Sequence, residues 1–170
     1  MSKVRDDALA KLEEARFFLK LMRRIENSQV PLLDGYTTKQ EYVYHLSAFV
    51  GACYSVTEYL WHGLKALRPL VDDFRDNKHK DVYGDGPAGG LRTQTVHFHP
   101  VVPQREGYEP PQGDQVNFEL REYRPSDGNQ VNFELKNEYY LTEDASEKPI
   151  TRLCENHLAE LNALVKQNCQ

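Results

Sequence analysis

The sequence predicts a mainly α protein, a helical bundle with a β-hairpin inserted before its C-terminal helix. Three observations predict this fold. Two long stretches near the N-terminus and a shorter one near the C-terminus carry apolar residues at helical spacing, and a segment between them alternates apolar and polar residues as a strand does. With 170 residues, of which 39% are hydrophobic and 28% charged, the chain is expected to form one domain over 1–170, with the hairpin insertion at 101–149.

The first two helices follow from their apolar stripes and their boundaries. The first is predicted from Lys3 to Asn27, with apolar residues at steps of three and four and charged residues on the other face. The second is predicted to begin at a capping box, Thr38-Lys39-Gln40-Glu41, and to run to about Leu67, because Pro69 stops it. A strip of small side chains on this helix is expected to contact another helix of the same chain, with a partner chain as the alternative: Ala48, Gly51, Ala52 and Ser55.

The remaining elements are shorter. A third helix is predicted at 69–76, followed by a polar, glycine-rich loop over 77–90 in which Gly89-Gly90 forms a hinge. The segment 115–120, Gln-Val-Asn-Phe-Glu-Leu, recurs at 130–135 with turn residues at 125–129, and this repeat predicts the two arms of the hairpin, extended by 139–142. A final helix is predicted at about 150–165.

The charge distribution, the apolar runs and the cysteines limit the class of protein. The net charge is −5, but residues 104–149 hold 5 basic and 11 acidic residues, which leaves 16 basic and 15 acidic residues elsewhere. The helical part is therefore close to neutral, which permits contact with RNA. The sequence shows no apolar run of about 18 residues and no apolar signal segment at its start. Its three cysteines form no paired motif, so a cytoplasmic location without membrane contact is expected.

The chemistry is expected at Arg92 and His97, five positions apart after the glycine pair. A guanidinium binds phosphate, and an imidazole exchanges a proton near neutral pH, so the pair is the smallest set of side chains that could cleave RNA without a metal ion. On an ideal helix the two residues would lie about 140° apart, so they converge only if Arg92 curls back, if a helix ends there, or if a dimer brings two pairs together. The alternative is a surface arginine and a locally packed histidine.

A metal site is a more distant interpretation of the same segment. If 95–102 is a strand, His97 and His99 point the same way and begin a metal site, but a third ligand is missing nearby. The sequence leaves open whether this segment is helix or strand.

Other candidate pairs have structural interpretations. Arg75 and His79, four apart, are expected to be solvated and mildly structural, with phosphate binding as the alternative. His45 and His157 fall near apolar stripes and are expected to be core histidines. Glu58, Trp61 and His62 could form a ligand cluster, although aromatic residues in a bundle are more often core residues.

The two long helices, the glycine-broken link and the Arg-x-x-x-x-His motif before a last helix resemble the HEPN superfamily of small helical proteins. The closest likeness is in the second helix, over 46–60, and the resemblance covers about 3–100 and the final helix. It implies a metal-independent endoribonuclease of a toxin or defence system, without a cofactor. Arg92 would bind the phosphate, His97 would be the acid/base, and Thr93 and His99 would support them.

The resemblance also implies partners. Active HEPN proteins commonly work as homodimers with the motif at the interface, and many toxins of the family pair with a nucleotidyltransferase-like antitoxin. The family usually has Asn, Asp or His where this chain has Thr93, and the acidic insertion is not carried over from the family. The alternative to an RNA-cleaving enzyme is a non-catalytic binding or regulatory module that dimerises through the bundle and recruits a partner through the hairpin.

Overall fold

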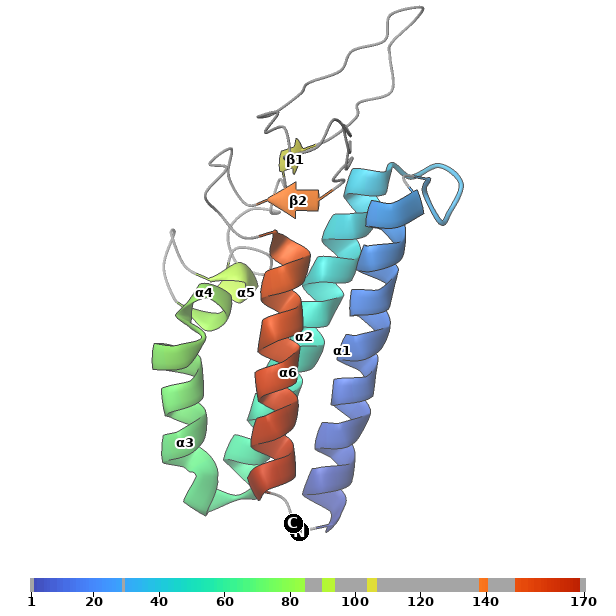
Figure 1. The fold of residues 1–170 in the computed structure, drawn as a ribbon. Helices are drawn as coiled ribbons and strands as arrows, with labels where there is room; N and C mark the ends of the chain where they lie inside the picture. Colours follow the sequence, from blue (N-terminus) through green and yellow to red (C-terminus); the bar gives the residue numbers. More distant parts are fainter. Residues whose placement is uncertain are drawn as a thin grey trace, which may run out of the picture.

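A computed structural model describes residues 2–28, 30–84, 90–93, 104–106, 138–140 and 149–168. Most of them are helical, which confirms the mainly α class. Three long helices stand side by side, namely α1 (Ser2–Ser28), α2 (Thr38–Gly63) and α6 (Ile150–Asn168) (Figure 1). Beside them run the 3-10 turn η1 (Lys65–Leu67), α3 (Arg68–Asp73), the π-helical turn η2 (Phe74–Lys78), α4 (Lys80–Tyr83) and α5 (Leu91–Thr93).

The connection from α1 to α2 is fixed by side chains that bond to its backbone. The carboxylate of Glu41, which is buried, accepts hydrogen bonds from the backbone N–H groups of Leu32 (2.6 Å) and Leu33 (2.7 Å). The capping box consists of Thr37 and Gln40 and not of Thr38 and Glu41, so its predicted position was wrong by one residue. Glu41 instead holds the preceding loop, because its side chain points back across the helix start.

The end of α2 also differs from the prediction. The helix ends at Gly63, and Leu64 leaves the helical region with φ −130° and ψ 88°. Pro69 does not stop this helix but lies in the first turn of α3. A proline fits that position because the first N–H groups of a helix have no partner within the helix. The chain therefore turns earlier than expected, and α3 runs back along α2.

The core lies between α1, α2 and α6. Its largest fully buried side chains come from all three helices and from the strand β2 (Glu138–Tyr140), and include Leu12, Met22, Tyr42, Phe49, Leu161 and Tyr139. The strip of small residues on α2 is divided between core and surface, since Ala52 is buried whereas Gly51 is exposed with nothing near the position of a Cβ atom. Packing within the chain thus accounts for part of the strip.

A two-stranded antiparallel sheet lies at one end of the bundle. It pairs β1 (Gln104–Glu106) with β2 (Glu138–Tyr140), with Arg105 opposite Tyr139. β2 docks on the helices because the Tyr139 ring packs 4.1 Å from that of Tyr42, centroid to centroid, and a carboxylate oxygen of Glu138 lies 3.5 Å from an Arg152 nitrogen. The predicted strand at 139–142 overlaps β2, whereas the repeated arms at 115–120 and 130–135 lie outside the described residues.

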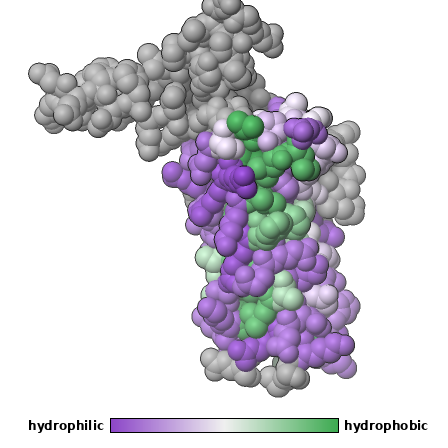
Figure 2. Space-filling model, turned by 90° about the vertical axis from the view of Figure 1, so that its right-hand side faces the viewer, coloured by the Kyte–Doolittle hydropathy of each residue, from purple (hydrophilic) through white to green (hydrophobic). Residues whose placement is uncertain are grey.

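One face of the bundle carries scattered apolar side chains. Figure 2 shows apolar patches on this face that are separated by hydrophilic side chains. The large exposed apolar residues of the described chain include Phe17, Val30 and Leu33. Isolated apolar residues on a surface are common in globular proteins.

Candidate functional site

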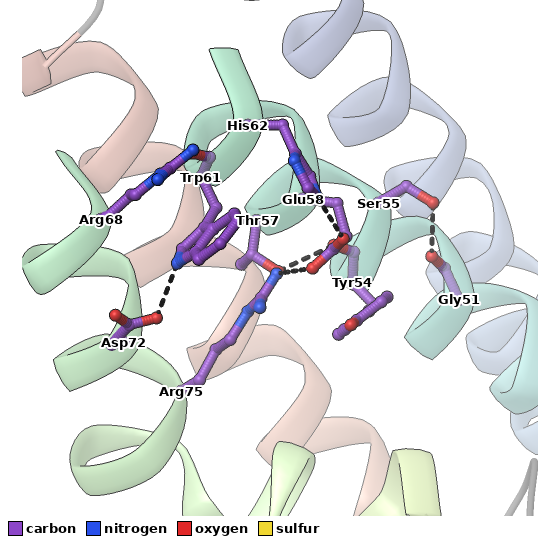
Figure 3. A network of polar contacts seen from close by, with 10 residues as sticks. All are labelled: Gly51, Tyr54, Ser55, Thr57, Glu58, Trp61, His62, Arg68, Asp72 and Arg75. Carbon is purple, nitrogen blue, oxygen red and sulfur yellow. Dashed lines mark hydrogen bonds and ion pairs between the residues drawn. The ribbon is translucent and has the colours of Figure 1, made fainter. Parts of the chain in front are cut away.

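One side of α2 presents aromatic and acidic residues towards α3. Tyr54, Glu58 and Trp61 are four and three residues apart, so they are neighbours on one side of the helix. Figure 3 shows Arg75 and Asp72 of the facing segment reaching this side, with Arg68 next to Trp61. The face is polar and half-buried and connects three parts of the chain.

Arg75 is the centre of this network. Its side chain is only 14% exposed, and its Nη2 donates to Glu58 Oε1 (2.6 Å) and to Thr57 Oγ1 (2.6 Å), while its Nε also donates to Thr57 Oγ1 (2.8 Å). The Thr57 hydroxyl in turn donates to the Tyr54 carbonyl (2.7 Å). These bonds fix the guanidinium against α2, so that it has one orientation.

The carboxyl group of Glu58 is held in its charged form. Burial raises its pKa, but hydrogen bonds from Arg75 and Tyr54 and the positive charges of Arg75 and His62 outweigh burial, and its pKa is lowered. A His62 ring nitrogen lies 3.3 Å from its other oxygen. Glu58 therefore acts as the anionic anchor of the network.

Arg92 joins this network from α5. Its Cζ lies 3.7 Å from the centroid of the Tyr54 ring, and the Cζ of Arg75 lies 4.7 Å from the same centroid. Cations attract the electron-rich face of an aromatic ring, and each such contact contributes about 0.5–2 kcal/mol depending on its desolvation. Two guanidinium groups that are 17 positions apart in the sequence thus meet on one ring.

The short helix α5 is fixed in place by close backbone packing. The Gly90 N–H donates to the Gly84 carbonyl (2.8 Å), and the Thr93 hydroxyl donates to the same carbonyl (2.7 Å). A Cβ on Gly90 would lie 2.5 Å from the Val82 carbonyl carbon. Gly90 was predicted to form a hinge with Gly89, but here it permits contact between α5 and α4, and Gly89 lies outside the described residues.

Two buried histidines lie deeper, where α6 meets η2 and α4. The His157 Nε2 is 2.8 Å from the Tyr83 hydroxyl, and its ring is 4.5 Å from that of His79, centroid to centroid. Desolvation, with a smaller contribution from His79, lowers the pKa of His157 from 6.5 to about 3. An Nε2 of His79 lies 3.2 Å from a Glu160 carboxylate oxygen. His157 is thus a neutral core residue, as its position on an apolar stripe predicted.

The predicted site residues are placed as follows. Arg92 is half-buried on Tyr54, and Thr93 is buried with its hydroxyl bonded to Gly84. His97 and His99 lie outside the described residues, so the approach of His97 to Arg92 stays a prediction. The solvated role expected for Arg75 and His79 is wrong, because Arg75 is bound to α2 and His79 is buried between Phe74 and His157.

Tyr54 and Thr57 are the members of the site that sequence reasoning missed. The spacing of Tyr54 with Glu58 and Trp61 placed all three on one face, which was a usable signal. What the sequence does not show is that η2 and α5 both bring an arginine to that face.

The arrangement suits an anionic ligand better than a metal. Guanidinium groups bind phosphate and carboxylate oxygens through paired hydrogen bonds. Within the described ranges, no three His, Cys, Asp or Glu side chains converge so that they could hold a metal ion. In the same part of the chain, no helix has the length and apolar content needed to cross a bilayer.

The fold and the site therefore define a mostly helical protein in which arginines from α3, η2 and α5 pack against one polar face of the second helix. Comparisons of the chain with protein-family models, with curated proteins and with solved structures found no match.

Proposed function

We propose that the chain is a HEPN-like helical protein that cleaves RNA without a metal ion, in a toxin or defence setting. The observation that carries the proposal is the meeting of Arg92 and Arg75 on the Tyr54 ring. It gives the arginine of the Arg-x-x-x-x-His motif a fixed position on a rigid helical face. Such preorganisation is what a group that stabilises developing phosphate charge requires.

In the proposed reaction, Arg92 binds the non-bridging oxygens of the scissile phosphate. The ribose 2′-oxygen loses its proton and forms a bond to phosphorus, while the bond from phosphorus to the 5′-oxygen breaks and that oxygen takes up a proton. His97 exchanges one of these protons as the acid/base. The products are a 2′,3′-cyclic phosphate and a 5′-hydroxyl end. Thr93 acts as a support by fixing α5 to Gly84.

Cleavage of RNA in EDTA tests the proposal. The wild type is expected to cleave, and Arg92→Ala and His97→Ala are each expected to lose activity at least 100-fold. Arg24→Ala is a matched control, because Arg24 is exposed on α1. Activity that survives both substitutions would contradict the assigned site. Activity that is lost in EDTA and restored by zinc would favour a metal site on His97 and His99 instead.

The proposal includes a homodimer in which two motifs face one groove. Mixing the Arg92→Ala and His97→Ala proteins tests this arrangement. If each site takes its arginine from one subunit and its histidine from the other, mixed dimers contain one intact pair and regain part of the activity. No recovery in a mixture shown to contain mixed dimers would contradict a site shared between subunits. A nucleotidyltransferase-like antitoxin remains the proposed partner of such a toxin.

A non-catalytic binding module is the second candidate function. It is favoured by the structural contacts that the motif residues make, since Arg92 packs on Tyr54 and the Thr93 hydroxyl is bonded to the backbone. Under this alternative the protein binds RNA or a partner protein without cutting RNA. Binding of RNA by the wild type without any cleavage product would favour it.

A further inference from the structure

The polar face of α2 continues beyond the Arg92 site to a second aromatic ring that carries an arginine. The Cζ of Arg68 lies 4.2 Å from the centroid of the Trp61 ring, and its Nε donates to the Trp61 carbonyl (3.0 Å). Trp61 is itself fixed, because its indole N–H donates to Asp72 Oδ1 (2.9 Å). Figure 3 shows this group on the same side of α2 as Arg75.

Arg68 keeps donors for a ligand. Stacking and its Nε bond hold the guanidinium in place, and within the described part of the chain its two terminal nitrogens donate to no protein atom. A half-buried guanidinium with a fixed plane and open terminal N–H groups is suited to binding a phosphate group. Arg75 differs from it, because its Nε and Nη2 already donate to Thr57 and Glu58.

The spacing of the two rings that carry Arg92 and Arg68 fits one extended ligand. Trp61 and Tyr54 are two helical turns apart on one side of α2, which corresponds to about 10 Å along the axis. A strand of a duplex has a charge about every 3.4 Å along the axis, and a single strand is more extended, so this distance spans at most about three nucleotides. A strand whose phosphate occupies Arg92 can therefore present another phosphate to Arg68.

We propose that Arg68, held by Trp61, is a second phosphate-binding residue that binds a single-stranded RNA segment next to the Arg92 site. The proposal rests on the proposed function, since it takes RNA as the ligand of Arg92. Two negative groups of this face are Glu58, which is paired with Arg75, and Asp72, which is exposed beside Trp61. Asp72 lowers the affinity of the surface for phosphate by repulsion.

Binding of a fluorescent single-stranded oligouridine to His97→Ala protein tests the proposal, because that background is expected to leave the RNA intact. Arg68→Ala is expected to weaken binding roughly tenfold and to reduce the slope of log affinity against log salt by about 0.7, the share of one phosphate contact on a single strand. Arg68→Lys should keep the slope, and Asp72→Asn should strengthen binding. Arg24→Ala again serves as the control with the same change in charge.

The outcomes separate this proposal from the function it rests on. If Arg68→Ala and Arg24→Ala bind alike while Arg92→Ala binds weakly, the second site is wrong and the proposed function stands. If the wild type neither cleaves nor binds RNA, both are wrong. Trp61→Phe is the control for a merely structural effect, because phenylalanine retains a ring for Arg68. This variant should keep the slope of log affinity against log salt. If Trp61→Phe and Arg68→Ala lose the same RNA affinity, the contact is only structural and the proposal is overturned.

Discussion

The buried His157 is expected to make the protein sensitive to acid. The folded chain keeps this imidazole neutral, with a pKa of about 3 against 6.5 for an exposed histidine. Because the pKa is lowered on folding, the unfolded chain binds the extra proton, so the stability that His157 provides is present above pH 6.5 and is lost as the pH falls towards 3. One pKa unit corresponds to about 1.4 kcal/mol, so the wild type should lose about 2 kcal/mol from this group between pH 7 and pH 5.

Urea unfolding at pH 7, 6 and 5 measures this loss. The test compares Tyr83→Phe with Tyr83→Phe/His157→Leu, because removing the Tyr83 hydroxyl avoids a buried hydroxyl without a partner in the double variant. Tyr83→Phe retains the imidazole, so its free energy of unfolding should fall by about 2 kcal/mol more than that of the double variant between pH 7 and pH 5. Equal pH dependence in the two proteins would refute the reasoning, because it would mean that His157 takes up no proton on unfolding.

Three further predictions concern the scaffold. Gly90→Ala should destabilise the fold by about 1–3 kcal/mol, because its Cβ would press on the backbone of α4, whereas Gly51→Ala, at an exposed helix position, should stabilise the fold by about 0.5–1 kcal/mol. Thermal unfolding compares the two variants, and an equal shift of the melting temperature in both would contradict the packing argument. Because Arg92 lies over the Tyr54 ring, its side-chain protons should be shifted upfield in NMR spectra by the ring current. Tyr54→Phe should keep this shift and Tyr54→Leu should abolish it. An unchanged shift in Tyr54→Leu would argue against the stacked position. Glu41→Leu should lower the free energy of unfolding by about 1–3 kcal/mol, since two partly buried hydrogen bonds to the backbone are lost, and no change in urea unfolding would show that the loop does not depend on Glu41.

The long helices could be predicted from the sequence because burial imposes a period on it. α1 and α6 begin within one residue of their predicted starts, as expected where one face of a helix is apolar and the other charged. The end of α2 was misplaced because a proline has two positional meanings. Pro69 ends a helix if the preceding residues are helical, and begins one if it occupies the first turn, and the sequence near Leu64 does not distinguish these cases.

The candidate site was predicted only in part, for a physical reason. Arg92 was identified from its spacing to His97, and Arg75 from its spacing to His79. Their meeting on Tyr54 depends instead on the positions of η2 and α5 against α2, which local patterns do not encode. The same applies to His79, which was expected to be solvated, whereas contact with His157 on α6 buries it.

The chemistry of the RNA ends tests the central claim most directly. Purified protein is incubated with a labelled single-stranded RNA in EDTA, and the new termini are identified by mass spectrometry. The proposed function predicts 2′,3′-cyclic phosphate and 5′-hydroxyl ends from the wild type and from Arg24→Ala, and no cleavage by Arg92→Ala or His97→Ala. Intact RNA with the wild type, or the same ends produced by all four proteins, would contradict it.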